Sequence, residues 1–334
     1  MRIVIALGGN AMTAADGSAR PEDQRAAIEV AVEPIAELIC AGHQVVLTHG
    51  NGPQVGNLLV KNELAAAVVP PVPLDWCGAQ TQATIGVLML NALDRALAAR
   101  GSAVRTAAVV SRTEVATDDP GFSQPSKPIG RYLSEAEARV MISHGQHWQD
   151  RGERGWRRVV ASPEPLRCVD APAVLALLDA GFAVVCSGGG GIPVVADGRP
   201  AGYRGVEAVI DKDLTAALLA GALDADRLII ATDVENAVQG WGTENPVPLT
   251  SISVDDLEAL AAEGAFASGS MEPKVAAVCR FVRRSGQSAA ITSLSKIARA
   301  LTGEAGTIVQ PAEDRPAEYG SAEHRSVHGG VIDA

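Results

Sequence analysis

Residues 3–10 read Ile3-Val4-Ile5-Ala6-Leu7-Gly8-Gly9-Asn10, an apolar run that ends in a glycine turn. The same pattern recurs where Val45-Val46-Leu47-Thr48-His49 enters Gly50-Asn51-Gly52-Pro53 and where Ala183-Val184-Val185-Cys186-Ser187 enters Gly188-Gly189-Gly190-Gly191. Short apolar runs bounded by turn residues are typical of buried parallel strands. Glycine at the carboxyl end of a strand lets backbone N–H groups approach an anion closely. The three turns therefore predict one anion-binding crevice along a single edge of a sheet.

The rest of the chain alternates between strand and helix patterns, which predicts an α/β protein with a mostly parallel sheet covered by helices on both faces. We expect strands at residues 2–7, 44–48, 104–110, 182–186, 227–231, 287–291 and 306–309. We expect helices at residues 21–41, from 54 onward, and at 79–100, 171–180, 213–221, 254–263 and 273–284. Pro34 should bend or interrupt the first helix because proline has no backbone N–H.

Residues 111–160 break this alternation. The segment from Asp118 to Gly130 is too rich in proline and glycine for a core element, and residues 149–158 are dense in charge. We interpret residues 111–160 as a flap that leaves the main sheet, resembling a hairpin and carrying one helix near residues 134–144. Residues 311–334 are polar and predict a tail, in which His324 and His328 would bind a metal only if the segment were helical.

The composition excludes several classes of protein. The net charge is −11, with only four Trp, three Tyr and four Phe, whereas a nucleic-acid surface needs basic stripes and stacking rings. No uncharged apolar stretch approaches the ~20 residues of a membrane helix, and the predicted first strand leaves no room for a signal peptide. The five cysteines have neither paired nor metal-ligand spacing, so we expect buried thiols and a cytoplasmic location.

Three lysines stand in settings that hold them in place. Lys212 lies between Asp211 and Asp213 and among apolar neighbours, which predicts partial burial and a retained charge. Lys274 follows a proline at a predicted helix start, and Lys127 lies between Ser126 and Pro128 on the predicted flap. His49 is interpreted as a structural histidine rather than a catalytic base.

The inventory lacks an obvious side-chain nucleophile, metal-ligand spacing, a Walker P-loop and a dinucleotide fingerprint. Anion-binding turns with dispersed lysines are enough for phosphoryl transfer, which works by positioning and charge stabilisation. We therefore expect a phosphotransferase that acts between a nucleoside triphosphate and an acid or a carbamate, with Mg²⁺ held mainly by the nucleotide phosphates.

Several ordered motifs resemble the carbamate kinases of the amino acid kinase superfamily. They are Ala6–Ala11, Thr48–Gly56, Pro125–Gly130, Ser187–Val194, Gly205–Leu214 and Gly269–Val275. The resemblance spans roughly residues 1–309. It implies a three-layer α/β/α sandwich, a cytoplasmic homodimer and a role in arginine catabolism. It also implies an acceptor lobe (1–110 and 159–200), a protruding flap subdomain (111–158) and a nucleotide lobe (201–310), with 311–334 as a tail.

The resemblance also implies roles for individual residues. Lys127, Lys212 and Lys274 would neutralise the phosphoryl group in transfer, and Asp213 would orient the lysines. The residues facing the phosphoryl and carbamoyl groups would be Gly8, Gly9, Asn10, Gly50 and Asn51, with Gly189 and Gly190 in support. The nucleotide would contact Asp211, Thr232, Asp233, Val234 and Met271.

Two positions depart from the family pattern. Glu272 stands where a small or apolar residue is usual, and a carboxylate there could repel polyphosphate or clamp Lys274. Val238 stands where an aromatic residue commonly follows the Thr-Asp-Val motif, so the sequence does not define which residues form the adenine pocket.

The resemblance as a whole implies a carbamate kinase that makes ATP from carbamoyl phosphate and ADP. Two alternatives remain: a paralogous kinase of another small carboxylate or carbamate-like acceptor, and a non-catalytic nucleotide or metabolite sensor.

Overall fold

The first apolar run forms strand β1 (Arg2–Leu7) near the centre of an eight-stranded sheet. The other strands of this sheet are β2 (Gln44–His49), β3 (Arg105–Ala108), β9 (Phe182–Val185), β12 (Arg227–Thr232), β15 (Ser251–Ser253), β16 (Ala289–Ser293) and β17 (Thr307–Gln310). Their order is β15-β17-β16-β12-β1-β2-β9-β3. The six strands from β16 to β3 are parallel, β17 is antiparallel to β16, and β15 is parallel to β17. This computed structural model describes residues 1–12, 20–200, 202–267 and 269–312.

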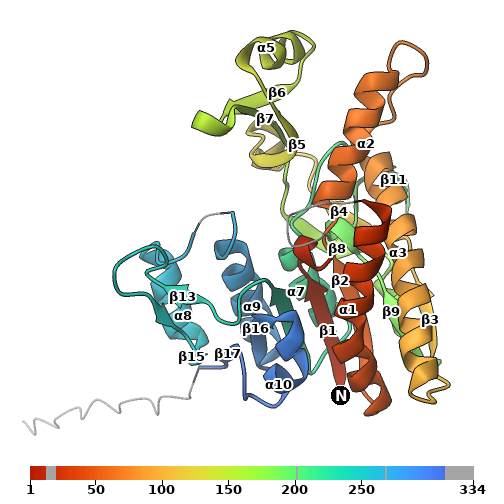
Figure 1. Cartoon of the computed structure of the whole chain (residues 1–334), viewed down its shortest axis with the longest axis vertical. Helices are drawn as coiled ribbons and strands as arrows, with labels where there is room; N and C mark the ends of the chain where they lie inside the picture. Colours follow the sequence, from red (N-terminus) through yellow and green to blue (C-terminus); the bar gives the residue numbers. More distant parts are fainter. Residues whose placement is uncertain (13–19, 201, 268, 313–334) are drawn as a thin grey trace, which may run out of the picture.

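Alternate residues of β1 face two separate apolar cores. Ile3, Ile5 and Leu7 belong to a core shared with α1 (Pro21–Cys40), α3 (Leu74–Ala99) and α10 (Ile297–Leu301). Val4 and Ala6 belong to a core shared with α6 (Ala171–Asp179), α7 (Lys212–Ala222), α8 (Val254–Ala262) and α9 (Glu272–Ser285). A strand buried on both faces reads as a continuous apolar run, which is why the sequence pattern identified it. The predicted sheet with helices on both faces is confirmed (Figure 1).

The three glycine turns lie at one edge of this sheet. β1, β2 and β9 are neighbours and run in the same direction, so their carboxyl ends lie side by side. The chain leaves β1 into η1 (Gly9–Met12), β2 into α2 (Gly52–Ala65) and β9 into η3 (Gly188–Gly190). The predicted common edge is confirmed. It is also the edge where ligands of open parallel sheets bind.

Two smaller sheets are formed by the segments that follow β3 and β9. One has the order β11-β10-β4-β8, and the other has the order β5-β7-β6. The elements of this part are β4 (Arg112–Val115), α4 (Pro120–Ser123), β5 (Lys127–Leu133), α5 (Glu135–Ser143), β6 (His147–Asp150), η2 (Gly152–Arg154), β7 (Trp156–Val160), β8 (Pro165–Cys168), β10 (Ile192–Ala196) and β11 (Tyr203–Gly205).

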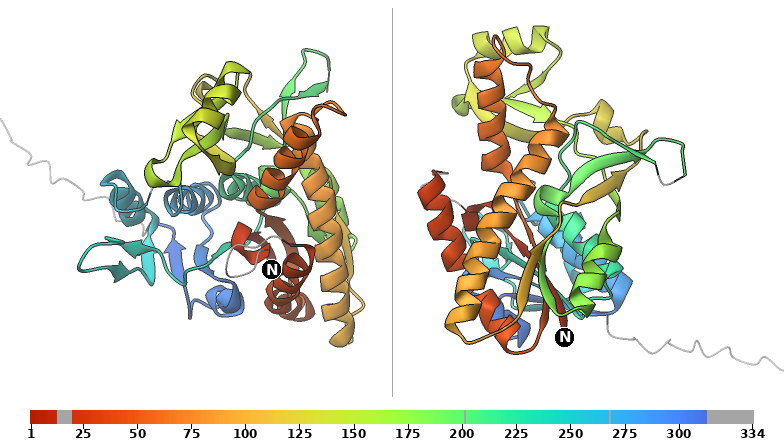
Figure 2. Two further views of the ribbon diagram at one scale, coloured as in Figure 1. Left: turned by 45° about the horizontal axis from the view of Figure 1, so that its top comes forward. Right: turned by 90° about the vertical axis from the view of Figure 1, so that its right-hand side faces the viewer.

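The part from β5 to β7 projects from the body beside the upper end of α2 (Figure 1, Figure 2). In the following, "flap" means residues 127–160. The helix expected near residues 134–144 is present as α5, where Ser134 accepts a hydrogen bond from the Glu137 N–H in a capping box. At the base of the flap, Ile129 and Val160 pack with Val55 and Leu59 of α2.

The remaining elements lie in the carboxyl-terminal part. β13 (Val238–Gln239) pairs with β14 (Val247–Pro248), and η4 (Leu294–Lys296) precedes α10. Among the described residues, no helix combines the length and apolar character needed to span a membrane. Most of the tail predicted at 311–334, including His324 and His328, lies outside the described residues.

Some sequence expectations are wrong in detail. α1 is not interrupted at Pro34, which lies inside the helix, and a bend at this position stays a prediction. α3 begins at Leu74 rather than near residue 79, with Pro73 at its N-cap. Cys40 is exposed at the end of α1, although the other four cysteines are buried as expected.

Candidate active site

Asp211 connects the flap to the first turn of α7. One carboxylate oxygen, Oδ1, accepts hydrogen bonds from the backbone N–H groups of Asp213 at 2.9 Å and Leu214 at 3.3 Å, so Asp211 is the N-cap of the helix. The other oxygen, Oδ2, accepts from the Lys127 Nζ at 2.7 Å. Residues 84 positions apart in the sequence are thereby joined across the crevice.

Asp213 binds the other two predicted lysines. Its side chain is 4% exposed, its Oδ1 accepts from Lys212 Nζ at 2.5 Å, and its Oδ2 accepts from Lys274 Nζ at 3.1 Å. Burial by itself raises the pKa of the Asp213 carboxyl, but the two ammonium groups outweigh it and hold the pKa below its ordinary value. Asp213 is therefore ionised and holds two positive charges close together. The sequence predicted that Lys212 is held in place by its flanking carboxylates, which agrees with its bond to Asp213.

Lys212 lies beside the first two glycine turns. A Cβ placed on Gly50 would be 3.6 Å from Lys212 Cδ and 3.0 Å from the backbone nitrogen of Gly9. The turns after β1 and β2 are thus in contact with each other next to this lysine. The Gly8 N–H donates to the Ala231 carbonyl and the Gly50 N–H to the Leu7 carbonyl, so these two glycines offer close approach rather than free donors. The side chain of Asn10 lies outside the described residues.

The third turn packs against the second. A Cβ on Gly188 would lie 2.3 Å from His49 Nε2, and a Cβ on Gly189 would lie 2.1 Å from Asn51 Nδ2. Gly190 accepts a hydrogen bond from Thr215 Oγ1 of α7. All four glycines of this run are buried. The first two glycines are required because His49 and Asn51 fill the space where a Cβ would be. At the last two, a Cβ would meet Ile210 and Thr113 instead.

His49 is held as a neutral ring in this packing. Burial lowers its pKa to about 4, with the nearby Lys212 charge acting in the same direction. Its Nδ1 lies 2.8 Å from the Gly50 carbonyl, and because a carbonyl can only accept, Nδ1 carries the proton. The structural role expected for His49 agrees with this geometry.

Two further side chains that the sequence reasoning missed support the turns. Gln82 Nε2 donates to the carbonyls of Ser111 and Gly188, and Gln82 Oε1 accepts from the Ser111 N–H. Ser111 Oγ in turn accepts from the Ser187 N–H at 2.7 Å. A lone glutamine on a helix carries no sequence signal for such a role, because its partners come from distant segments.

A cavity of about 150 Å³ opens on the other side of Lys274. Four of the predicted nucleotide residues line it together with that lysine: Thr232, Asp233, Val234 and Met271. Val238 and Trp241 also line it, and the indole of Trp241 is 66% exposed. Trp241 supplies an aromatic ring near the position where Val238 lacks one. The sequence reasoning missed Trp241, and its position between Gly240 and Gly242 was the feature that could have identified it.

Glu272 does not clamp Lys274. The Glu272 side chain is exposed at the first position of α9, and within the described part of the chain it forms no ion pair. Lys274 is paired with Asp213 instead. The possible repulsion of polyphosphate by Glu272 is left as a prediction.

The structure therefore places two lysine sites at the start of α7. Lys212 and Lys274 share Asp213, and Lys127 pairs with Asp211. Gly9 and Gly50 lie in contact with each other beside Lys212. Asn51 of the second turn donates to Thr81 Oγ1 at 2.9 Å and packs against Gly189, whereas Gly190 packs against Ile210. Thr232, Asp233, Val234 and Met271 lie at the separate cavity next to Lys274. The arrangement concentrates positive charge where a carboxyl-end crevice meets a small cavity, which suits the transfer of a phosphoryl group.

Residues 1–293 match the profile of the amino acid kinase family. The chain belongs to this family. It is 42% identical to a carbamate kinase of Trichomonas vaginalis over 313 residues, which cover 93% of this chain and all of the relative. It is 44% identical to the carbamate kinase-like protein YqeA of Escherichia coli over 92% of this chain and 98% of the relative.

Solved structures of the family have the same fold. The carbamate kinase of Giardia lamblia bound to AMP-PNP superimposes with a TM-score of 0.88 at 40% identity, covering 93% of this chain and 98% of that one. A protein of Aeropyrum pernix gives the same TM-score at 40% identity, with 93% and 100% covered. The predicted amino acid kinase fold and the resemblance to the carbamate kinases are confirmed.

Proposed function

We propose that this protein is a carbamate kinase that transfers a phosphoryl group between ATP and carbamate, with ATP formation from carbamoyl phosphate and ADP as the working direction. The observation that carries the proposal is the Lys212–Asp213–Lys274 group, which lies between the glycine turns and the cavity of Thr232 and Met271. Relatives named carbamate kinase at 40–42% identity over nearly the whole chain support it.

In the proposed reaction the bonds form and break between the two substrates, and the protein positions them and stabilises charge. An oxygen of the β-phosphate of ADP forms a bond to the phosphorus of carbamoyl phosphate, while the bond from that phosphorus to the carbamate oxygen breaks and leaves its electron pair on carbamate. Negative charge spreads over the three other oxygens of the phosphoryl group as it moves. Lys212 and Lys274 would stabilise that charge from the body of the protein, and Lys127 would do so from the flap.

The nucleotide would occupy the cavity beside Lys274. The base would contact Trp241 and Met271, and the phosphates would extend toward Lys274 and Lys212. The AMP-PNP complex of the Giardia carbamate kinase supports nucleotide binding in this fold. Asp211 would act through Lys127 and the α7 N-terminus rather than by contact with the base.

Mg²⁺ would bind mainly to the nucleotide phosphates, where it would add positive charge. Within residues 1–12, 20–200, 202–267 and 269–312, no three His, Cys, Asp or Glu side chains are grouped to hold a metal. Asp211 and Asp213 are engaged by the lysines. Such a site fits an ion that keeps few protein ligands.

The similarity to the carbamate kinases supports further proposals about the domains, the location and the oligomeric state. The acceptor lobe would comprise residues 1–110 and 159–200, and the nucleotide lobe residues 201–310. Residues 111–158, which include most of the flap, would form a protruding subdomain, and residues 311–334 would form a tail. The protein would act in the cytoplasm as a homodimer, in arginine catabolism. The exposed Trp76 and Val87 on one face of α3, at 60% and 55% exposure, support a second copy there.

A coupled assay of the purified protein tests the activity. We expect ATP to form from carbamoyl phosphate and ADP in the presence of Mg²⁺, at a rate that depends on Lys212. No ATP above the background of the Lys212→Ala variant would refute the assignment.

A second candidate is a kinase of another small carboxylate or carbamate-like acceptor. It is favoured by the 44% identity to a relative that is named only carbamate kinase-like. Nucleotide binding with no reaction of carbamoyl phosphate, but with ADP release on addition of another acceptor, would support it. Binding without any turnover would support a sensor, against which the intact lysine group argues.

A further inference from the structure

A cavity of about 520 Å³ lies where helix α5 of the flap meets the end of α2 and the start of α3. Its volume is within the usual range for small-molecule sites. Neither the glycine turns nor the three predicted lysines line it. The function proposed above therefore leaves this cavity unassigned.

One wall of the cavity is apolar. Leu59 and Leu74 belong to the buried cluster at the base of the flap, and Val72 packs against this cluster. Val140 and Met141 of α5 line the cavity from the side of the flap. These side chains can remove the apolar part of a ligand from water, which favours binding in proportion to the area buried.

Arg158 of β7 lines the same cavity without a direct partner. It is half-buried, and in the described part of the chain its guanidinium forms neither an ion pair nor a hydrogen bond, whereas ten other arginines pair with carboxylates. Burial lowers the pKa of Arg158 below its ordinary value, although the Glu207 and Glu63 charges act in the opposite direction. A charge that loses water without gaining a partner is unfavourable unless a ligand or ordered water compensates for it.

Two carboxylates line the cavity together with this guanidinium. Glu207 Oε2 accepts from the Leu74 N–H at 3.4 Å, which holds Glu207 at the start of α3. Glu63, near the end of α2, forms no ion pair within the part of the chain that the structure describes, so its carboxylate can accept from a ligand. A simple anion would leave Glu63 without a partner, and a simple cation would leave Arg158 without one. The charges therefore suit a zwitterion.

We propose that this cavity is a binding site for a small α-amino acid with an apolar side chain. The carboxylate of the ligand pairs with the Arg158 guanidinium, whose parallel N–H groups match the two carboxylate oxygens. The ammonium group donates to Glu63, and the Glu207 charge adds to the attraction. The side chain of the ligand lies on Leu74 and Met141 at the apolar wall.

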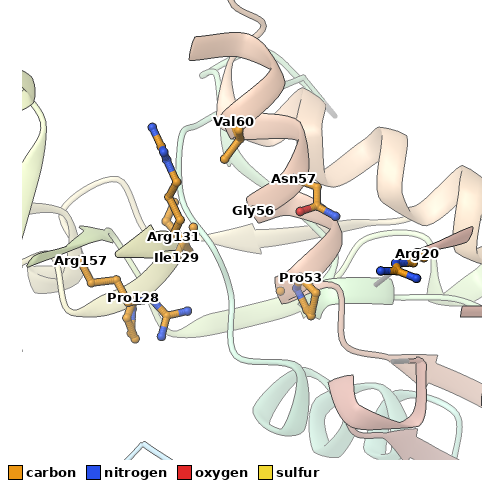
Figure 3. A pocket seen from close by; sticks show the side chains of 11 residues that line it. Arg20, Pro53, Gly56, Asn57, Val60, Pro128, Ile129, Arg131 and Arg157 are labelled. Atoms are coloured by element: carbon orange, nitrogen blue, oxygen red, sulfur yellow. The ribbon is translucent and has the colours of Figure 1, made fainter. Parts of the chain in front are cut away.

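The proposed site is separate from the crevice in which the reaction would occur. Arg157, the residue before Arg158, lines a different cavity between the flap and the start of α2 (Figure 3). Successive side chains of a strand point to opposite faces, so the two cavities lie on opposite faces of the flap sheet. An amino acid and the substrates of the kinase should therefore bind at the same time.

Calorimetric titration of the full chain with L-leucine at neutral pH tests the site. Isocaproate and isoamylamine are the matched probes, because the first lacks the ammonium group of leucine and the second lacks its carboxylate. We expect saturable binding of leucine that is about tenfold tighter than that of either analogue. No binding of leucine, or equal affinity for leucine and isocaproate, would overturn the proposal without the need for any variant.

Two variants assign the charges. In Arg158→Gln, leucine should bind no more tightly than isoamylamine, and in Glu63→Gln it should bind no more tightly than isocaproate. Arg139→Gln is the matched control and should bind leucine as the wild type does, since Arg139 also lies on the flap but pairs with Glu135. Unchanged leucine binding in both Arg158→Gln and Glu63→Gln would contradict the assignment.

Competition separates this site from the lysine sites. Saturating ADP or carbamoyl phosphate should leave the Kd of leucine unchanged, and so should Lys212→Ala. Displacement of leucine by carbamoyl phosphate would assign the amino acid to the lysine sites and refute the proposal. A wild-type protein that binds leucine but makes no ATP would refute the proposed kinase activity and leave this site standing.

Discussion

The two lysine sites of this protein differ in how deeply the lysine side chains are buried and in which part of the fold carries them. Lys212 and Lys274 share Asp213 inside the body, and their side chains are only 14% and 15% exposed. Lys127 reaches Asp211 from the flap, and its side chain is 33% exposed. The first group rests on the sheet edge and α7, while the second depends on where the flap lies.

The difference indicates that Lys212 and Lys274 have a different role in catalysis from Lys127. Charges that are already fixed in a partly buried site stabilise a transition state without further rearrangement. A lysine on a projecting element can instead make its contribution conditional on a bound ligand. The body pair would thus act on every phosphoryl group that enters, and Lys127 would act once the acceptor side is occupied.

The largest effect is expected for Lys212→Ala. The side chain lies between Gly50 and Asp213, so its loss removes the charge nearest both turns. We expect kcat for ATP formation to fall about a thousandfold with little change in thermal stability. The exposed Lys61→Ala on α2 is the control. Activity within threefold of the wild type would contradict the proposed role of Lys212 and Lys274.

Lys127→Ala should reduce kcat less, by about a hundredfold. The KM for carbamoyl phosphate should rise, and nucleotide affinity should not change, because Lys127 lies away from the cavity next to Lys274. Steady-state kinetics and nucleotide titration separate the two parameters. A variant that loses nucleotide affinity instead would show that the two lysine sites are not distinct.

Asp213→Asn should affect stability as well as rate. An amide in place of the buried carboxylate leaves two ammonium groups without their counter-charge, so kcat should fall about tenfold and unfolding free energy by about 3 kcal/mol at pH 7. Because the folded pKa of Asp213 is lowered, its contribution is present above the unfolded value near ~3.9 and is lost as pH falls through the folded pKa.

The measurement is denaturant unfolding of Asp213→Asn and the wild type from neutral to acid pH. The stability gap should be widest at neutral pH and should narrow below about pH 4. Asp118→Asn, at an exposed position, should show no gap. A gap that grows in acid would reverse the sign and exclude an ionised Asp213.

The smallest effect is expected for Trp241→Ala. Loss of the indole from the cavity beside Lys274 should weaken nucleotide binding about fivefold, which is the scale of one aromatic contact, with no change in the KM for carbamoyl phosphate. Fluorescence titration with ADP measures it, and Trp241→Phe should restore most of the affinity. An unchanged Kd would place the base elsewhere.

The sequence by itself determined the buried strands of the sheet, one held lysine and the family of this protein. Apolar runs such as Ile3–Leu7 identified buried parallel strands, because strands covered on both faces cannot alternate with polar residues. The Asp211–Asp213 triplet indicated a held lysine through its flanking charges. The motifs from Ala6 to Val275 identified the family. Local chemistry was sufficient in each of these cases.

Only the tertiary structure decided which groups meet. The Asp213 bridge to Lys274 spans 61 residues, and the Asp211 bridge to Lys127 spans 84, so neither follows from spacing along the chain. The contact of the four glycines at 188–191 with an anion stays a prediction. Their packing depends on the tertiary structure, because a Cβ would meet His49 or Asn51 at the first two positions and Ile210 or Thr113 at the last two. These contacts join segments that are far apart in the sequence, so they form only when the chain folds.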